Sequence, residues 1–169
     1  YVFSIWPVPR DAGPRTRGML VPSTELGGES FGYHEIDSDH IAFYLLDVCG
    51  HGVGAALLSV TAINVLRSAA LPNTDFRDPG AVLSALNEAF PMEKQNNMYF
   101  TIWYGVHKRS TGELRYASAG HPPSVLCTSG GDVLTLSTPG IAVGMMPDMA
   151  YRTKLGKIAS GDRLHLVSD

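Results

Sequence analysis

The stretch Tyr44–Ser59, YLLDVCGHGVGAALLS, places an acid and a glycine-rich loop between an apolar strand and an apolar helix. Residues 40–48 form a nearly continuous apolar run, which is typical of a strand that is buried on both faces. We expect the helix from about Val53 to Ala70. Because apolar residues fall on nearly every side of this helix, the pattern predicts that it lies between two layers.

Outside this stretch, the pattern predicts one folded domain behind an irregular N-terminal segment. Residues 1–21 are expected to be a linker or an irregular N-terminal entry segment, since residues 7–18 alone carry three prolines and two glycines. Strand character is expected in RGMLVPS, from residue 17 onward. The remainder, residues 22–169, is long enough to bury a core of its own. The sequence therefore predicts a domain boundary near residue 21.

The second half of the chain predicts one more helix followed by antiparallel strands. Asp78 is placed as the helix cap and Pro79 at the first helical position, and apolar residues then recur at helical spacing. After Met98, short apolar segments alternate with turn sequences, which favours antiparallel pairing. Strands, a helical pair and further strands together indicate an α+β layered domain.

Composition and charge exclude several classes of protein. The 169 residues carry a net charge of −3, which gives no electrostatic basis for binding nucleic acid or an anionic membrane. No apolar run approaches the roughly 20 residues of a membrane span, and no secretion signal opens the chain. Cys49 and Cys127 lie in different segments, so we expect no disulfide framework. The expected location of the protein is therefore the reducing cytoplasm. The chain begins without Met and stops at Asp169 within a pattern, as expected of a piece of a longer protein.

The glycine loop raises a question of charge. Its spacing is G-x-G-x-G, which fails the dinucleotide-binding pattern, and the carboxylate of Asp47 would repel a bare phosphate. A divalent cation between acid and phosphate would remove that conflict, and the glycines would allow close approach of the backbone. The alternative is that Asp47 only caps the helix and the glycines only form a turn. The stretch by itself leaves both interpretations open.

Two further acids favour the metal. Glu29 follows a glycine pair at the start of a strand, and Asp169 ends an apolar strand as Asp47 does. These strand ends could meet at one edge of a sheet. Three carboxylates form a set of hard oxygen ligands, which suits Mg²⁺ or Mn²⁺ better than zinc.

Five motifs, in order, resemble those of the SpoIIE/RsbU-type serine phosphatases, the bacterial branch of the PP2C-like phosphatases. They are ELGGESFGYH, LLDVCGHGVGAALLS, MYFTIWYGV, ASAGHPPSVL and GDRLHLVSD, within residues 22–169. The resemblance implies a PP2C-like α-β-β-α sandwich of two antiparallel sheets flanked by helices, C-terminally incomplete in this chain. It also implies hydrolysis of phosphoserine or phosphothreonine on a regulatory partner protein, such as an anti-sigma-factor antagonist, by a metal-activated water.

The resemblance also implies a ligand set for two Mn²⁺ or Mg²⁺ ions. Asp47 matches the aspartate that bridges the two metals, with the backbone carbonyl of Val48 as its companion. Asp169 matches a ligand of the second metal, and Glu29 stands where the family usually has aspartate. A further family aspartate would lie beyond Asp169, so the two-metal site is expected to be incomplete in this chain.

The motifs contain further candidates for the site. His51, in the glycine loop with Gly50 and Gly52, is a candidate general acid, and a solvent-facing loop histidine is the alternative. His121, after Gly120, is a candidate site residue, and ordering of a turn is the alternative. Cys49 lacks the C-x5-R loop of a cysteine phosphatase and is interpreted as a packing residue.

Three function classes remain open. The first is a metal-dependent protein serine/threonine phosphatase, and the second is a phosphatase-like binding module with a metal site weakened by Glu29 that acts by sequestering its partner. The third is a small-molecule phosphohydrolase that uses the same metals. The expected partners are a phosphorylated regulatory protein and an upstream sensor or receiver domain of the full-length chain, with a homodimer as a further option.

Overall fold

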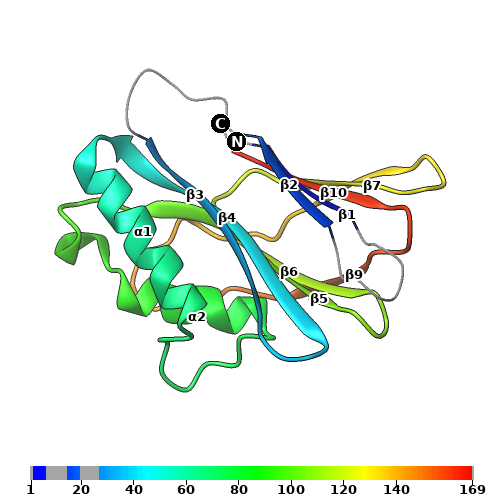
Figure 1. Ribbon diagram of the computed structural model, residues 1–169. Coiled ribbons are helices and arrows are strands. Elements are labelled where there is room, and N and C mark those ends of the chain that lie inside the picture. Colours follow the sequence, from blue (N-terminus) through cyan, green and yellow to red (C-terminus); the bar gives the residue numbers. More distant parts are fainter. Residues whose placement is uncertain (1, 7–14, 20–26, 169) are drawn as a thin grey trace.

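The computed structural model describes residues 2–6, 15–19 and 27–168, which form two stacked antiparallel sheets with helices on one side (Figure 1). Sheet A has the order β2 (Arg15–Met19), β1 (Val2–Trp6), β10 (Arg163–Val167), β7 (Ser124–Cys127), β8 (Val133–Leu136). Sheet B has the order β3 (Gly27–Glu35), β4 (His40–His51), β5 (Phe100–Lys108), β6 (Glu113–Ala119), β9 (Lys154–Lys157). The helices are α1 (Val53–Arg67), α2 (Pro79–Ala89) and the short 3-10 helix η1 (Met92–Lys94).

Strand β4 is the centre of the fold because it contributes to two cores. All six residues of 41–46 are buried, as the continuous apolar run predicted. Successive side chains of a strand point to opposite faces, so Phe43 and Leu45 lie between the two sheets, whereas Tyr44 and Leu46 lie under the helices. The run is apolar throughout because neither face of the strand meets water.

The core between the sheets is closed by aromatic side chains. Trp103 of β5 is fully buried and stacks on Phe43 and on Tyr116, with ring centroids 5.7 Å apart in both pairs. Its indole N–H donates a hydrogen bond to the carbonyl of Leu136 in β8, at 3.1 Å. This bond joins sheet B to sheet A and satisfies the only polar atom of the largest buried side chain.

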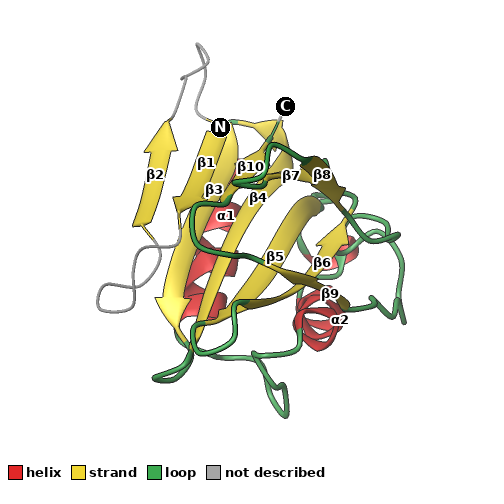
Figure 2. Cartoon of the chain, turned by 90° about the vertical axis from the view of Figure 1, so that its right-hand side faces the viewer, coloured by secondary structure: helices red, strands yellow, loops and turns green. Residues whose placement is uncertain are grey.

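Both α-helices cover the same face of sheet B (Figure 2): α1 contacts β3 and β4, and α2 contacts β5 and β6. The prediction that α1 lies between two layers is wrong, since Val53, Leu57 and Val60 are exposed on its outer side. The described part of the chain places no helix on the outer face of sheet A. None of the described helices has the length and apolar content needed to cross a membrane.

The start of α2 differs in detail from the expected cap. Asp78 is the N-cap residue and Pro79 follows it, as predicted, but the Asp78 side chain makes no capping hydrogen bond. It accepts a hydrogen bond from the hydroxyl of Thr153, and that hydroxyl accepts from the backbone N–H of Gly80 at 2.8 Å. Thr153 therefore caps the helix from a distant part of the chain.

Two parts of the strand pattern also differ from the expectation. Strand β1 falls within the segment expected to be a linker and pairs with β10 on one side and with β2 on the other, whereas β2 overlaps the strand character expected from residue 17 onward. The prolines that suggested a linker lie between these two strands, at residues 7–14, which are outside the described residues. Strand β9 was not expected, because its sequence KLGK has a single large apolar residue and follows no alternating pattern.

Candidate metal and phosphate site

The site is built on three neighbouring strands of sheet B. In their antiparallel register Glu29 of β3 lies opposite Asp47 of β4, and Asp47 lies opposite Thr101 of β5. These three residues continue the same face as the row Phe31, Leu45 and Trp103, two positions along each strand. We call Glu29, Asp47 and Thr101 the polar row. It lies at one end of the core between the sheets.

A histidine extends this row on the β5 side. His121 is buried, and its Nδ1 lies 3.0 Å from the hydroxyl oxygen of Thr101. Gly120 precedes it with φ of +64°, and a Cβ there would lie 2.9 Å from the backbone nitrogen of Ala142. Only glycine fits this position, so the turn that presents His121 has little freedom. The structure thus brings the predicted residue His121 into contact with the polar row, through a threonine.

Sheet A reaches the row from the other side. The hydroxyl of Ser168, directly after β10, donates a hydrogen bond to a carboxylate oxygen of Glu29 at 3.3 Å. The end of β10 therefore lies beside the residue that faces Asp47. Asp169 itself lies outside the described residues, so its role as a metal ligand stays a prediction.

The loop after Asp47 carries the glycines in conformations that favour glycine. Gly50 and Gly52 both have φ of +89°, and a Cβ at either position would meet no atom within 4 Å. These glycines are required by backbone conformation and not by close packing. Gly52 is the N-cap of α1 and offers no capping side chain. His51 between them is exposed at the end of β4.

The donor set fits a hard divalent cation. The half-buried acids Glu29 and Asp47 supply carboxylate oxygens on adjacent strands, and the Val48 carbonyl lies on the β3 side of β4, against Gly28. Oxygen donors of this kind suit Mg²⁺ or Mn²⁺. Among the described residues no three His, Cys, Asp or Glu side chains come close enough together to hold a metal ion. A complete ligand set would therefore require Asp169 or water.

Cys49 makes a contact that holds two segments of the fold together. It is half-buried, and its Sγ accepts a hydrogen bond from the backbone N–H of Tyr99 at 3.2 Å. This contact holds the segment before β5 against the end of β4. It agrees with the interpretation of Cys49 as a packing residue.

Thr101 belongs to the polar row and Ser168 contacts it, although the sequence did not single them out. Thr101 is the one non-aromatic polar side chain in the motif YFTIWYGV. Since every second side chain of a strand shares a face, its spacing from Trp103 would have placed it on the inward face. Ser168 offers no comparable signal beyond its place next to Asp169.

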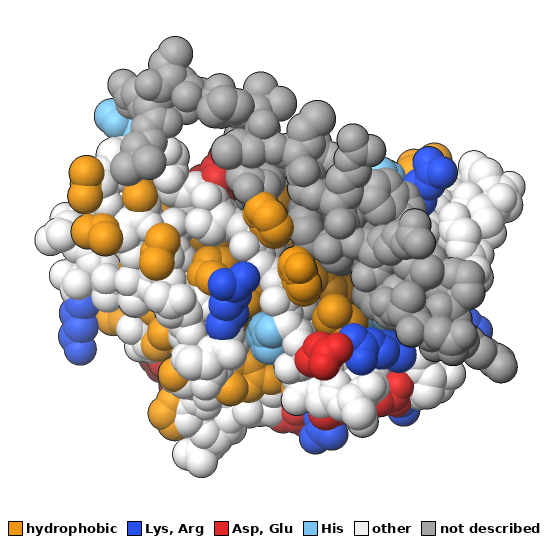
Figure 3. Space-filling model, in the orientation of Figure 1, with side chains coloured by type: hydrophobic (Ala, Val, Ile, Leu, Met, Phe, Trp, Pro, Cys, Tyr) orange, Lys and Arg blue, Asp and Glu red, His pale blue; other side chains and the backbone are white. Residues whose placement is uncertain are grey.

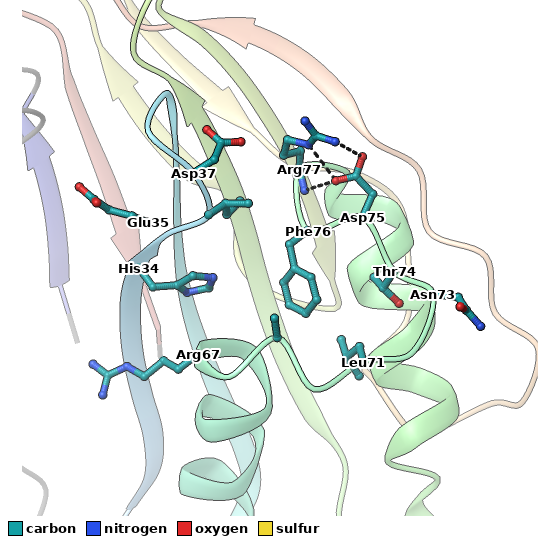
Figure 4. Close-up of a pocket in the computed structure, with 12 residues that line it drawn as sticks. His34, Glu35, Asp37, Arg67, Leu71, Asn73, Thr74, Asp75, Phe76 and Arg77 are labelled. Atoms are coloured by element: carbon teal, nitrogen blue, oxygen red, sulfur yellow. Dashed lines mark hydrogen bonds and ion pairs between the residues drawn. The ribbon is translucent and has the colours of Figure 1, made fainter.

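A separate pocket of about 710 Å³ lies at the other end of sheet B (Figure 4). Its lining includes His34, Phe76 and the ion pair of Asp75 with Arg77, at 3.0 Å. Figure 4 shows the His34 ring pointing toward Phe76. Since His34 lies opposite Ala42, five residues before Asp47, the pocket is roughly 17 Å away along the strand. It is not part of the polar row.

Comparison with known proteins agrees with the motif resemblance. The sequence model of the family described as Stage II sporulation protein E (SpoIIE) matches residues 37–169. The chain is 26% identical to the phosphoserine phosphatase RsbP of Bacillus subtilis over 151 residues, which covers 87% of this chain and 37% of RsbP. It is 29% identical to protein IcfG of Synechocystis over 170 residues, which covers 86% of this chain and 27% of IcfG.

The fold of the chain is also similar to that of a solved PP2C domain. The SiaA-PP2C domain of Pseudomonas aeruginosa superposes with a TM-score of 0.66 at 24% identity, covering 95% of this chain and 57% of that one. The predicted pair of stacked antiparallel sheets is thereby confirmed as a PP2C-like fold. The chain spans about a third of the length of the curated relatives that it matches.

Proposed function

Because the chain belongs to the SpoIIE family of PP2C-like serine phosphatases, we propose that it is a metal-dependent phosphatase acting on phosphoserine or phosphothreonine of a protein. The observation that supports this most is the pairing of Glu29 with Asp47 across two strands, beside a glycine loop at a helix start. Acids beside such a loop would repel a phosphate, and a divalent cation between the acids and the phosphate would remove that repulsion.

Asp47, Glu29, Asp169 and the Val48 carbonyl would hold Mn²⁺ or Mg²⁺. Bound there, the metals would lower the pKa of a water and offset the charge of the phosphoryl oxygens. Asp47 stands in the middle of the row, with Glu29 on one side and Thr101 on the other. The family resemblance would give Asp47 the role of contacting both metals, and its central place in the row is compatible with that role.

The remaining residues of the site would position the substrate and move a proton. His51 is exposed at the mouth of the loop, where it could donate a proton to the departing serine oxygen. Gly50 and Gly52 shape the loop and leave open space where side chains would stand, so a phosphoryl group could approach the backbone. Thr101 and His121 would fix the β5 side of the row.

The partner in this proposal is a phosphorylated regulatory protein. The relative RsbP is itself described as a phosphoserine phosphatase, and the chain covers only part of it. A sensor or receiver domain elsewhere in the full-length protein belongs to the same proposal. Glu29, one methylene longer than the usual aspartate, supports the alternative of a binding module with a weakened metal site.

Replacing Asp47 tests the proposal. Asp47→Asn keeps the shape of the side chain and removes its charge. Since changes outside the ligand shell already cost 10–100-fold, we expect loss of Mn²⁺-dependent turnover by more than about a hundredfold. Asp132→Asn, in the exposed turn between β7 and β8, is the matched control and should keep full activity. Near-native turnover by Asp47→Asn would refute the metal site.

The choice of substrate separates the function classes. Turnover of p-nitrophenyl phosphate by the unmodified chain distinguishes an enzyme from a binding module. Faster turnover of a phosphorylated protein than of free phosphoserine distinguishes a protein phosphatase from a small-molecule phosphohydrolase. Circular dichroism of each variant confirms that the fold is retained.

A further inference from the structure

Helix α1 exposes a stripe of large apolar side chains at the end nearest the candidate site. Val53, Leu57 and Val60 lie on successive turns and are 67%, 64% and 52% exposed. The same stripe continues at helical spacing as Asn64 and Arg67, both exposed and polar. The apolar exposure is thus confined to the first two turns, which follow directly on the glycine loop.

Packing of the fold does not account for this stripe. The helix buries a different face against sheet B, made of Ala55, Leu58, Ser59, Ala62, Ile63 and Leu66. Single exposed apolar residues are common on protein surfaces, but a contiguous row of them is typical of an interaction site. Figure 3 shows hydrophobic side chains on the surface over α1.

A second apolar segment stands at the same end of the domain. Met145 and Met146 are 43% and 53% exposed. The buried side chain of Asn87, at the end of α2, holds this segment through hydrogen bonds to the Gly144 N–H and the Met146 carbonyl, both 2.8 Å long. Val143 forms a bridge with Phe100, the cross-strand neighbour of Val48. The methionines are therefore anchored near the strand end that carries Asp47.

The loop between α2 and β5 joins the two segments. Its residue Met92 donates a backbone hydrogen bond to the Gly144 carbonyl at 3.0 Å. Its other end, Met98, packs on α1, where a Cβ at Gly54 would lie 3.6 Å from the Met98 methyl group. We call the five exposed residues Val53, Leu57, Val60, Met145 and Met146 the apolar rim.

We propose that the apolar rim docks an apolar segment of the phosphoprotein substrate next to its phosphoserine. This inference rests on the proposed phosphatase function and names how the protein partner is recognised. The rim begins at Val53, directly after Gly52 of the glycine loop, so a segment bound there could extend around the start of α1 to a phosphate held at that loop. Helix α1 has no charged residue before Arg67, so the recognised segment would be apolar and not acidic or basic.

The size of the rim favours a transient substrate over a permanent partner. A few side chains of this kind expose a few hundred Å², whereas a stable interface buries about 800 Å² on each partner. A substrate must leave after the reaction, so a small contact suits it. Methionines adapt their shape to different apolar partners, which suits the second segment of the rim to the same role.

Peptide binding tests this inference without requiring turnover. Two fluorescent phosphoserine peptides of equal length would be compared, one with leucines flanking the phosphoserine and one with serines in those places. Because burial of one leucine side chain corresponds to roughly tenfold in affinity, the leucine peptide should bind about tenfold more tightly by anisotropy. Leu57→Ser should reduce this preference to about twofold or less.

Leu155→Ser is the matched control. Leu155 is 67% exposed, much as Leu57 is, but lies on the edge strand β9. This variant should keep the tenfold preference. The inference is overturned if the unmodified chain shows no preference for leucine, or if both variants lose it equally.

Two further measurements separate the alternatives. If the unmodified chain sediments as a dimer and Leu57→Ser as a monomer, the rim is covered by a second copy and the inference is wrong. Turnover of p-nitrophenyl phosphate is measured in the same samples. A chain that binds leucine peptides through the rim but hydrolyses nothing would refute the phosphatase proposal and leave the docking surface in place.

Discussion

Gly28→Ala should separate strand β3 from β4 at the polar row. A Cβ at Gly28 would lie 2.6 Å from the Cβ of Val48 and 2.9 Å from its carbonyl oxygen. Ordinary contacts between carbon atoms are about 3.5–4.0 Å, so roughly 1 Å of movement is required. Val48 is 2% exposed and cannot move aside, so the strands must shift.

The expected loss of stability follows from that overlap. Overpacking of a buried position costs about 1–3 kcal/mol, which lowers the urea midpoint by roughly 0.5–1.5 M at a slope of about 2 kcal/mol per M. Glu29 follows Gly28 directly and would move away from Asp47, so Mn²⁺ affinity measured by calorimetry should weaken as well. The two readouts connect the packing of the strands to the proposed metal site.

Gly27→Ala is the matched control for this experiment. A Cβ at Gly27 would meet only the Glu29 nitrogen, at 3.9 Å, which is an ordinary contact. The free energy of unfolding of this variant should stay within about 0.5 kcal/mol of that of the unmodified chain. Equal urea midpoints for the two variants would refute the argument that close approach of β3 to Val48 requires glycine.

Two further predictions concern titration and ligand length. Burial, aided by the Arg67 charge for His34 and the Arg109 charge for His107, lowers the pKa of both histidines. Their contribution to stability is present above about pH 6.5 and is lost as pH falls through the lowered values, so unfolding free energy should drop between pH 7 and 5. The drop should be smaller in His34→Gln, and an equal drop would contradict this. Glu29→Asp should tighten Mn²⁺ binding in calorimetry, whereas clear weakening would mean that the site requires the longer side chain.

The central strand and the loop after it could be predicted because their sequence signals are local. A strand buried on both faces must be apolar at every position, and residues 41–46 meet that condition. The loop glycines have positive φ, which few other residues adopt, so the sequence marks the turn. Both features follow from the chemistry of a few consecutive residues.

The outer side of α1 could not be predicted in the same way. Burial of a helix face depends on what packs against it, and an apolar pattern all round is ambiguous between a buried helix and a surface helix with a binding stripe. Val53, Leu57 and Val60 would be expected inside a protein, yet they are exposed. The sequence showed that these positions are apolar but not what covers them.

The polar row was predictable only in part, because its members meet through pairing between distant segments. Asp47 and Glu29 could be chosen as acids at strand ends, but their direct opposition depends on the register of β3 and β4. Thr101 and Ser168 are ordinary polar residues in sequence, and their importance appears only through the contacts with His121 and Glu29. The identity of a residue in the sequence does not show which distant residue it contacts in the fold.

The place of Asp47 explains why a site can be rigid at the end of a strand. Its neighbours Leu46 and Val48 are buried under the helices, at 0% and 2% exposure, so the backbone on both sides is fixed by packing. Alternation then turns the Asp47 side chain to the opposite face, where the core between the sheets ends and polar partners begin. A carboxylate placed in this way loses little conformational entropy when it binds a cation, because the fold has already restricted it. The same packing that buries the strand therefore prepares the acid for its proposed role.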